Sequence, residues 1–198
     1  MEHLSLFITA ALTALAIENM VFARALGLSR DTMFMSSAKA GIIFGGTLTW
    51  MALFSSLFVS LANYILVENP YILILRPIAY LLGVIIVYIA TSYSVGYILP
   101  DSIASGVHEA MPVSTFNSAL FGYFFVSASQ SLNFIQTVGY SLGTGLGYTG
   151  AILVIYFGRK RLAISPIPRS FMGLPILLIY LGLISLAIFG LVGHVLPT

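Results

Sequence analysis

Long apolar runs separated by short polar breaks dominate the pattern of this chain. Runs of about 18 residues or more are typical of membrane-spanning helices, because only helices and closed barrels satisfy every backbone group in lipid, and barrel strands give shorter, alternating segments. Six transmembrane helices are predicted, at residues 4–28, 38–66, 71–99, 110–128, 134–158 and 171–192. The longest predicted connections are 100–109 and 159–169. We therefore expect one all-α integral membrane domain, 1–198, with no room for a soluble domain.

The first and fourth runs contain polar side chains where an apolar helix is expected. Glu18 and Asn19 lie near the middle of the first run, and Thr115 and Asn117 lie near the start of the fourth. Interrupted segments in corresponding positions of two halves are typical of inverted repeats whose broken helices meet at a site. The pattern thus predicts two inverted three-helix repeats, about 1–99 and 100–198, with the first and fourth helices interrupted near Asn19 and Asn117.

An ionised side chain near the bilayer midplane costs at least about a few kcal/mol, so the negative charge of Glu18 requires compensation. Protonation, a bound cation or a hydrogen-bond donor on a neighbouring helix would each provide it. Arg24 lies about 240° from Glu18 around a continuous helix, so the two are not expected to pair, and Arg24 can instead reach toward the interface.

The polar residues of the two interruptions form a candidate ion path or midplane polar site. Its members are Glu18, Asn19, Thr115 and Asn117. The alternative is that the two asparagines only form hydrogen bonds between helices.

Composition and charge place the chain in a membrane and suggest its orientation. Of 198 residues, 59% are hydrophobic and 7% are charged, whereas soluble domains carry about a quarter charged residues. Of the first, third and fifth connections, which share one side of the membrane, the first and fifth carry or adjoin most of the positive residues, at Arg30, Lys39, Arg159, Lys160, Arg161 and Arg169. Since cytoplasmic loops retain positive charge, both termini are expected outside a bacterial or archaeal cytoplasmic membrane. Nothing in this distribution indicates nucleic-acid binding.

The residue types exclude several kinds of site. The chain has no cysteine and only three histidines, which are scattered. Disulfides, thiolate catalysis and metal ligation by this chain alone are therefore not expected, and no catalytic residue is predicted. Glycines recur in the second run at Gly41, Gly45 and Gly46, and in the fifth at Gly139, Gly143, Gly145, Gly147 and Gly150. We interpret them as positions of close helix packing.

Motifs along nearly the whole chain carry a family resemblance. They are Met1-Glu2-His3, Ser5-Leu6-Phe7, Glu18-Asn19-Met20, Leu26-Gly27-Leu28, Pro112 with Thr115 and Asn117, Asn133-Phe134, Gly139-Tyr140, Gly143-Thr144-Gly145, Arg159-Lys160-Arg161, Pro168, Gly173 and residues 190–193. In these motifs the chain resembles the six-span membrane subunits of the Rnf and Nqr complexes, and is most similar to the E subunit of Nqr and the A subunit of Rnf.

The resemblance implies partners and a cofactor. In that family, two six-span subunits of opposite topology associate about a pseudo-twofold axis, and flavin and iron–sulfur subunits lie on the two sides. Each six-span subunit contributes one cysteine from each interrupted helix to a [2Fe–2S] cluster. The matching positions here are Ser29 and Ser118. Because a serine hydroxyl is far less acidic than a thiol and is a poor cluster ligand, we expect the cluster to be absent.

The sequence therefore favours a non-catalytic membrane subunit of an Rnf/Nqr-like, ion-translocating electron-transport complex. Two alternatives remain. One is a cysteine-free transporter or channel for a cation or small solute on the same inverted-repeat scaffold. The other is a purely structural membrane scaffold, in which replacing Glu18 changes nothing.

Overall fold

All regular elements in the described part of the chain are helical. The computed structural model describes residues 2–33 and 35–192. Its elements are α1 (Glu2–Leu12), η1 (Thr13–Ile17), α2 (Arg30–Met33), α3 (Ala38–Leu66), α4 (Ile72–Ile98), α5 (Asp101–Thr115), α6 (Ser118–Ser129), α7 (Phe134–Ala163), η2 (Arg169–Phe171) and α8 (Leu174–Val192). Among these, α3, α4, α7 and α8 are long and apolar enough to cross a bilayer. The predicted all-helical, membrane-embedded, multi-pass class is thus confirmed.

Two further apolar helical stretches are shorter. The first is α1 continued by η1, and the second is α6. Each falls below the length of about 17 residues that a spanning helix requires. These short stretches lie where the sequence predicted the first and fourth helices.

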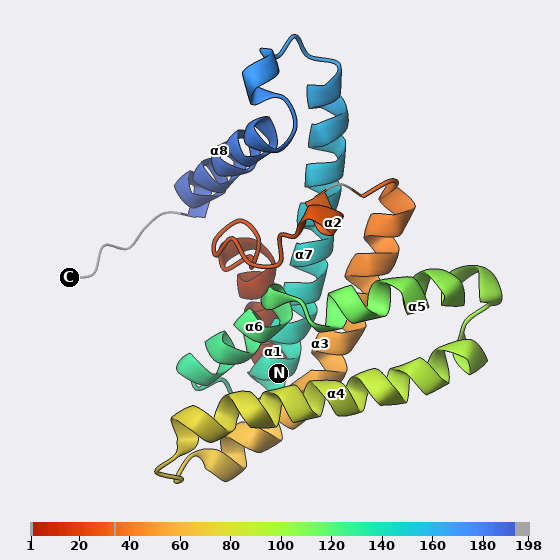
Figure 1. Cartoon of the computed structure of the whole chain (residues 1–198). Helices are drawn as coiled ribbons and strands as arrows, with labels where there is room; N and C mark the ends of the chain where they lie inside the picture. Colours follow the sequence, from red (N-terminus) through yellow and green to blue (C-terminus); the bar gives the residue numbers. More distant parts are fainter. Residues whose placement is uncertain (1, 34, 193–198) are drawn as a thin grey trace.

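The centre of the molecule is formed by α3 and α7, which share the most extensive helix–helix interface. As Figure 1 shows, α1 lies against α7, while α4 and α5 run side by side and both pack on α3. Helix α8 extends to one side and contacts chiefly α7. This arrangement leaves α7 in contact with both the first helical stretch and α6.

Glycine allows α7 to approach its neighbours closely. A Cβ atom added at Gly139 would collide with the backbone of Phe7, and one added at Gly143 would collide with the backbone of Ala11. Two glycines on one face of α7 therefore bring its backbone against that of α1. The packing interpretation is confirmed for six of the eight glycines, Gly41, Gly45, Gly139, Gly143, Gly145 and Gly147. It is wrong for Gly46 and Gly150, where an added Cβ atom meets nothing within 4 Å.

Where α3 and α7 cross, each helix has a glycine that packs against a threonine of the other helix. Gly45 of α3 lies against the side chain of Thr149, and Gly145 of α7 lies against Thr49. Each helix thus provides the gap that the threonine of the other helix fills, which brings the two axes close together.

The predicted connection at 100–109 is wrong, because this stretch is helical. Helix α5 begins at Asp101 directly after Pro100, whose backbone has φ −60° and ψ 147°. A proline before the first turn costs no helical hydrogen bond, and an acidic residue there favours the helix dipole. Ala104 and Met111 are buried on this helix. The polar residues that suggested a loop therefore belong to an amphipathic helix.

Candidate functional site at two helix breaks

The first break follows η1. Glu18 has left helical geometry, with φ −104° and ψ 38°, although its N–H still donates to the carbonyl of Thr13 at 2.8 Å. The side-chain oxygen of Asn19 then accepts hydrogen bonds from the N–H groups of Val21 (3.0 Å) and Phe22 (3.3 Å). Asparagine offers the backbone an alternative to the helix ladder in this way. Residues 18–29 therefore form an irregular segment with one capped turn.

The second break separates α5 from α6. Its centre is Asn117, which has the extended backbone of an N-cap and whose side-chain oxygen accepts from the N–H of Ala119 at 2.9 Å. At both breaks an asparagine side chain therefore accepts a backbone hydrogen bond and starts a new turn after the interrupted helix. Both Asn19 and Asn117 are buried.

Tyr148 of α7 connects the two breaks. Its hydroxyl donates to the carbonyl oxygen of Gly27 at 2.7 Å and accepts from the side-chain amide of Asn117 at 3.1 Å. Gly27 has φ 84°, a left-handed conformation that favours glycine. Its N–H donates to the hydroxyl of Ser118 at 2.8 Å. Sequence reasoning missed Tyr148, since no local signal distinguishes it among the 11 tyrosines.

Glu18 is held by three donors. Arg24 donates from Nη2 at 2.9 Å, and the hydroxyl of Tyr140 on α7 donates at 2.7 Å. Gln130, which follows α6, donates from Nε2 to both carboxylate oxygens, at 2.9 and 3.0 Å. The expectation that Glu18 and Arg24 cannot pair is wrong, because it assumed a continuous helix and the chain turns at Glu18 instead. Of the three proposed forms of compensation, the structure contains donors from neighbouring elements.

The structure does not bring the four residues of the candidate ion path together in one hydrogen-bond network. Glu18 bonds Tyr140, whereas Asn117 bonds Tyr148. Tyr140 and Tyr148 lie on the same helix, about 12 Å apart along its axis at 1.5 Å per residue. Asn19 bonds its own helical end, donating from Nδ2 to the carbonyl of Leu15 at 3.0 Å.

Thr115 and Glu18 differ in environment. The side chain of Thr115 is 0% exposed, and its hydroxyl has no hydrogen-bond partner within the described residues. The side chains of Glu18 and Arg24 are 26% and 39% exposed, respectively. One member of the predicted set is therefore a buried, unpaired hydroxyl, and another is a partly accessible ion pair.

The two serines at the positions of the family cysteines have structural partners. The Ser29 hydroxyl accepts from the N–H of Thr32 at 3.2 Å, and the Ser29 N–H donates to the Thr32 hydroxyl at 2.8 Å. These bonds cap the short helix α2. Ser118 contacts the first break through Gly27, two residues before Ser29. The fold thus brings the segments carrying the two serines together.

Comparison with known proteins decides the family. The family described as "Rnf-Nqr subunit, membrane protein" matches residues 7–195. The chain belongs to this family. The resemblance inferred from the sequence motifs is confirmed.

Curated relatives of this Rnf-Nqr subunit cover nearly its whole length. It is 29% identical over 194 residues to the A subunit of the ion-translocating oxidoreductase complex of Pectobacterium atrosepticum, covering 98% of each chain. It is 26% identical over 186 residues to the A subunit of the complex of the same name from Syntrophotalea carbinolica, covering 92% of this chain and 94% of the relative. Identity and coverage are the same with the A subunit of the Na(+)-translocating ferredoxin:NAD(+) oxidoreductase complex of Acetobacterium woodii.

Proposed function

We propose that this Rnf-Nqr subunit is an integral membrane subunit of an ion-translocating oxidoreductase complex. It contributes a path of polar groups for the translocated ion, called the polar path below, and no catalytic residue. The names of its relatives support the assignment to such a complex. The observation that carries the polar path is the pair of helix breaks, which are linked through Tyr148 and carry Glu18 on one side.

The proposed topology has six crossings in two inverted repeats, about 1–99 and 100–198. The first crossing consists of α1, η1 and the irregular segment 18–29, and the fourth consists of the end of α5 with α6. The short apolar helices at these two places support this, since each needs the adjoining segment to reach the length of a crossing. The positive connections support outward termini at the cytoplasmic membrane.

A second six-span subunit of opposite topology is the proposed neighbour at the first break. Irregular backbone at membrane depth is tolerated only where protein or a water-filled cavity covers it. Ala23, Arg24 and Ala25 of this segment are exposed in the isolated chain. A protein partner at this face would satisfy that requirement, with flavin and iron–sulfur subunits on the two aqueous sides.

The proposed subunit carries no [2Fe–2S] cluster. Iron–sulfur clusters are normally held by thiolates, and the residues at the two positions are hydroxyls. Both hydroxyls already accept backbone hydrogen bonds, Ser29 from Thr32 and Ser118 from Gly27. The donor set therefore does not fit the cluster, and no electron step is assigned to it.

Glu18 is the proposed ion-carrying group of the path. Its side chain is partly exposed, and Arg24 is the single cation paired with it among the described residues. A translocated Na⁺ or H⁺ would compete with Arg24 for the same oxygen atoms. Gln130 and Tyr140 would hold the carboxylate in place while its cation changes.

The test uses the whole complex in proteoliposomes, with redox-driven cation uptake and electron transfer measured together. Glu18→Gln is expected to abolish coupled uptake, whereas Glu68→Gln, at an exposed position between α3 and α4, should leave it unchanged. Uptake that persists in Glu18→Gln would refute the ion path. Cation flux through this chain alone, without redox partners, would favour the transporter alternative.

Iron analysis tests the cofactor proposal separately. The iron content of the purified complex should be the same in the wild type and in Ser29→Ala with Ser118→Ala. A loss of about two iron atoms per complex, the content of one [2Fe–2S] cluster, would contradict the proposal.

A further inference from the structure

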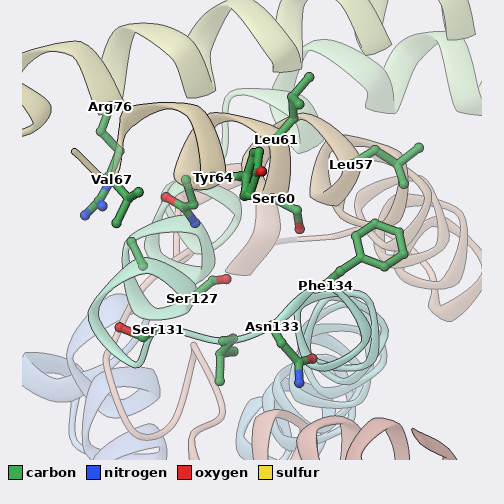
Figure 2. A pocket seen from close by; sticks show the side chains of 13 residues that line it. Leu57, Ser60, Leu61, Tyr64, Val67, Arg76, Ser127, Ser131, Asn133 and Phe134 are labelled. Atoms are coloured by element: carbon green, nitrogen blue, oxygen red, sulfur yellow. The ribbon is translucent and has the colours of Figure 1, made fainter. Parts of the chain in front are cut away.

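A groove of about 720 Å³ lies outside the two helix breaks, between α3, α4, α6 and the start of α7. Figure 2 shows that side chains from all of these elements face it. Its polar lining includes Ser60, Ser127 and Asn133, and its apolar lining includes Leu61 and Phe134. None of these residues takes part in the hydrogen bonds around Glu18 or Tyr148.

The groove lies at one end of the helix bundle. Val67 lines it directly after the end of α3, and residues 131–133 line it from the connection between α6 and α7. Two connections therefore meet at the same end. In a membrane protein the ends of spanning helices lie near the lipid headgroups, where the polar part of a phospholipid resides.

Arg76 gives the groove a positive charge that is not neutralised. It is the one charged side chain among the described residues lining the groove, and no carboxylate of the described residues forms an ion pair with it. Its Nε atom is buried without a hydrogen-bond partner in the described part of the chain. In Figure 2 its guanidinium extends from α4 toward the segment with Ser127 and Ser131. A buried guanidinium N–H without a partner is costly, and an anion beside Arg76 would both accept this hydrogen bond and neutralise the charge.

We propose that this groove binds an anionic phospholipid, whose phosphate pairs with Arg76. Guanidinium groups bind phosphate through charge-assisted hydrogen bonds, and basic pockets between membrane helices bind acidic headgroups. The hydroxyls of Ser60 and Ser131, which also line the groove, offer further donors to a polar headgroup. Leu57, Leu61 and Phe134 are 46%, 54% and 54% exposed, respectively, and form an apolar wall for an acyl chain. The phosphate and the acyl chain thus find matching surfaces in one groove.

Lipid binding to the purified complex tests this proposal. Delipidated complex in detergent is titrated with phosphatidylglycerol or phosphatidylcholine, and bound lipid is counted by native mass spectrometry. Wild type is expected to prefer phosphatidylglycerol. Arg76→Gln should weaken phosphatidylglycerol binding about tenfold, the effect of losing one charge-assisted contact. Arg76→Lys should retain most of the binding, and Arg169→Gln, at an exposed arginine in η2, should bind like wild type.

A pair of variants at Ser60 and a soluble competitor test the groove and the nature of the ligand separately. Ser60→Leu fills the groove without removing charge and should also lose the lipid, whereas Ser60→Ala should not. Equal phosphatidylglycerol binding by wild type, Arg76→Gln and Ser60→Leu would overturn the proposal. Displacement of the lipid by an equal concentration of glycerol 3-phosphate would also overturn it, since the ligand would then be a soluble phosphate. Lipid binding is measured without ion transport, so its outcome is separate from that of the proposed function.

Discussion

The hydroxyl of Tyr148 lies 2.7 Å from the carbonyl oxygen of Gly27 and donates a hydrogen bond to it, across 121 positions of sequence. The same hydroxyl accepts from the amide of Asn117, so one side chain of α7 bonds both helix breaks. Carbonyl and amide groups at helix breaks have no helical partner and depend on such side chains. The relative position of the two breaks therefore depends on α7.

Tyr148→Phe should destabilise the protein by about 1–3 kcal/mol, because the buried amide of Asn117 loses its partner and the carbonyl of Gly27 keeps only the longer bond from the Thr32 hydroxyl, at 3.4 Å. Unfolding in detergent, followed by circular dichroism, measures the change. Tyr97→Phe is the control, since Tyr97 is 93% exposed. Equal stability of the two variants would show that the bonds of Tyr148 contribute nothing.

Gly143→Ala should destabilise the protein by about 1–3 kcal/mol, because the added methyl group collides with the backbone of Ala11 and forces α1 away from α7. Gly150→Ala on the same helix is the matched control, because a Cβ atom there meets nothing within 4 Å. Alanine also has the higher helix propensity, so the control should be neutral or more stable. Thermal unfolding of both variants makes the comparison, and a stabilised Gly143→Ala would contradict the close packing.

Glu18 and Arg24 should show energetic coupling. In a double-mutant cycle with Glu18→Gln and Arg24→Gln, the coupling free energy of unfolding should reach at least about 0.5 kcal/mol, as is usual for residues in direct contact. Glu18→Gln with Arg169→Gln is the control cycle, because Arg169 lies in η2, far along the chain, and no contact joins the two residues among those described. Additive effects in the first cycle would mean that the pair is not formed.

Thr115→Val should leave stability unchanged or slightly increase it, because the replaced hydroxyl is buried without a partner in the described structure. Thr144→Val is a parallel variant on α7, where another buried threonine hydroxyl is unpartnered. Redox-driven cation uptake by the complex then tests whether the Thr115 hydroxyl belongs to the ion path. A loss of uptake in Thr115→Val alone, at unchanged stability, would place this hydroxyl in the ion path. Unchanged uptake would remove Thr115 from it.

The sequence predicts the positions of the breaks because their causes are local. Asn19 and Asn117 each accept hydrogen bonds from N–H groups two residues further along the chain, so the side chain that interrupts the helix is next to the interruption. The helical class follows in the same way from the length of the apolar runs. The connection predicted at 100–109 fails because a local count of polar residues does not distinguish a loop from an amphipathic helix.

The hydrogen bonds between side chains of the site depend on the tertiary fold, and the sequence pattern therefore does not predict them. Glu18 pairs with Arg24 only because the backbone turns between them, and helix geometry alone predicts the opposite. Tyr140 and Gln130 reach Glu18 from elements more than a hundred residues away. The separation of Glu18 from Asn117 likewise depends on the path of α7 past both breaks, because Glu18 bonds Tyr140 and Asn117 bonds Tyr148.

The Glu18–Arg24 pair has a consequence for biosynthesis. These are the two charged residues in the stretch 4–29, and their opposite charges cancel. Burying a single ion in lipid costs about several kcal/mol, but a neutral pair formed within one segment reduces that cost before any other helix has been made. If the first segment crosses the bilayer as proposed, it therefore enters the membrane together with its own counter-ion.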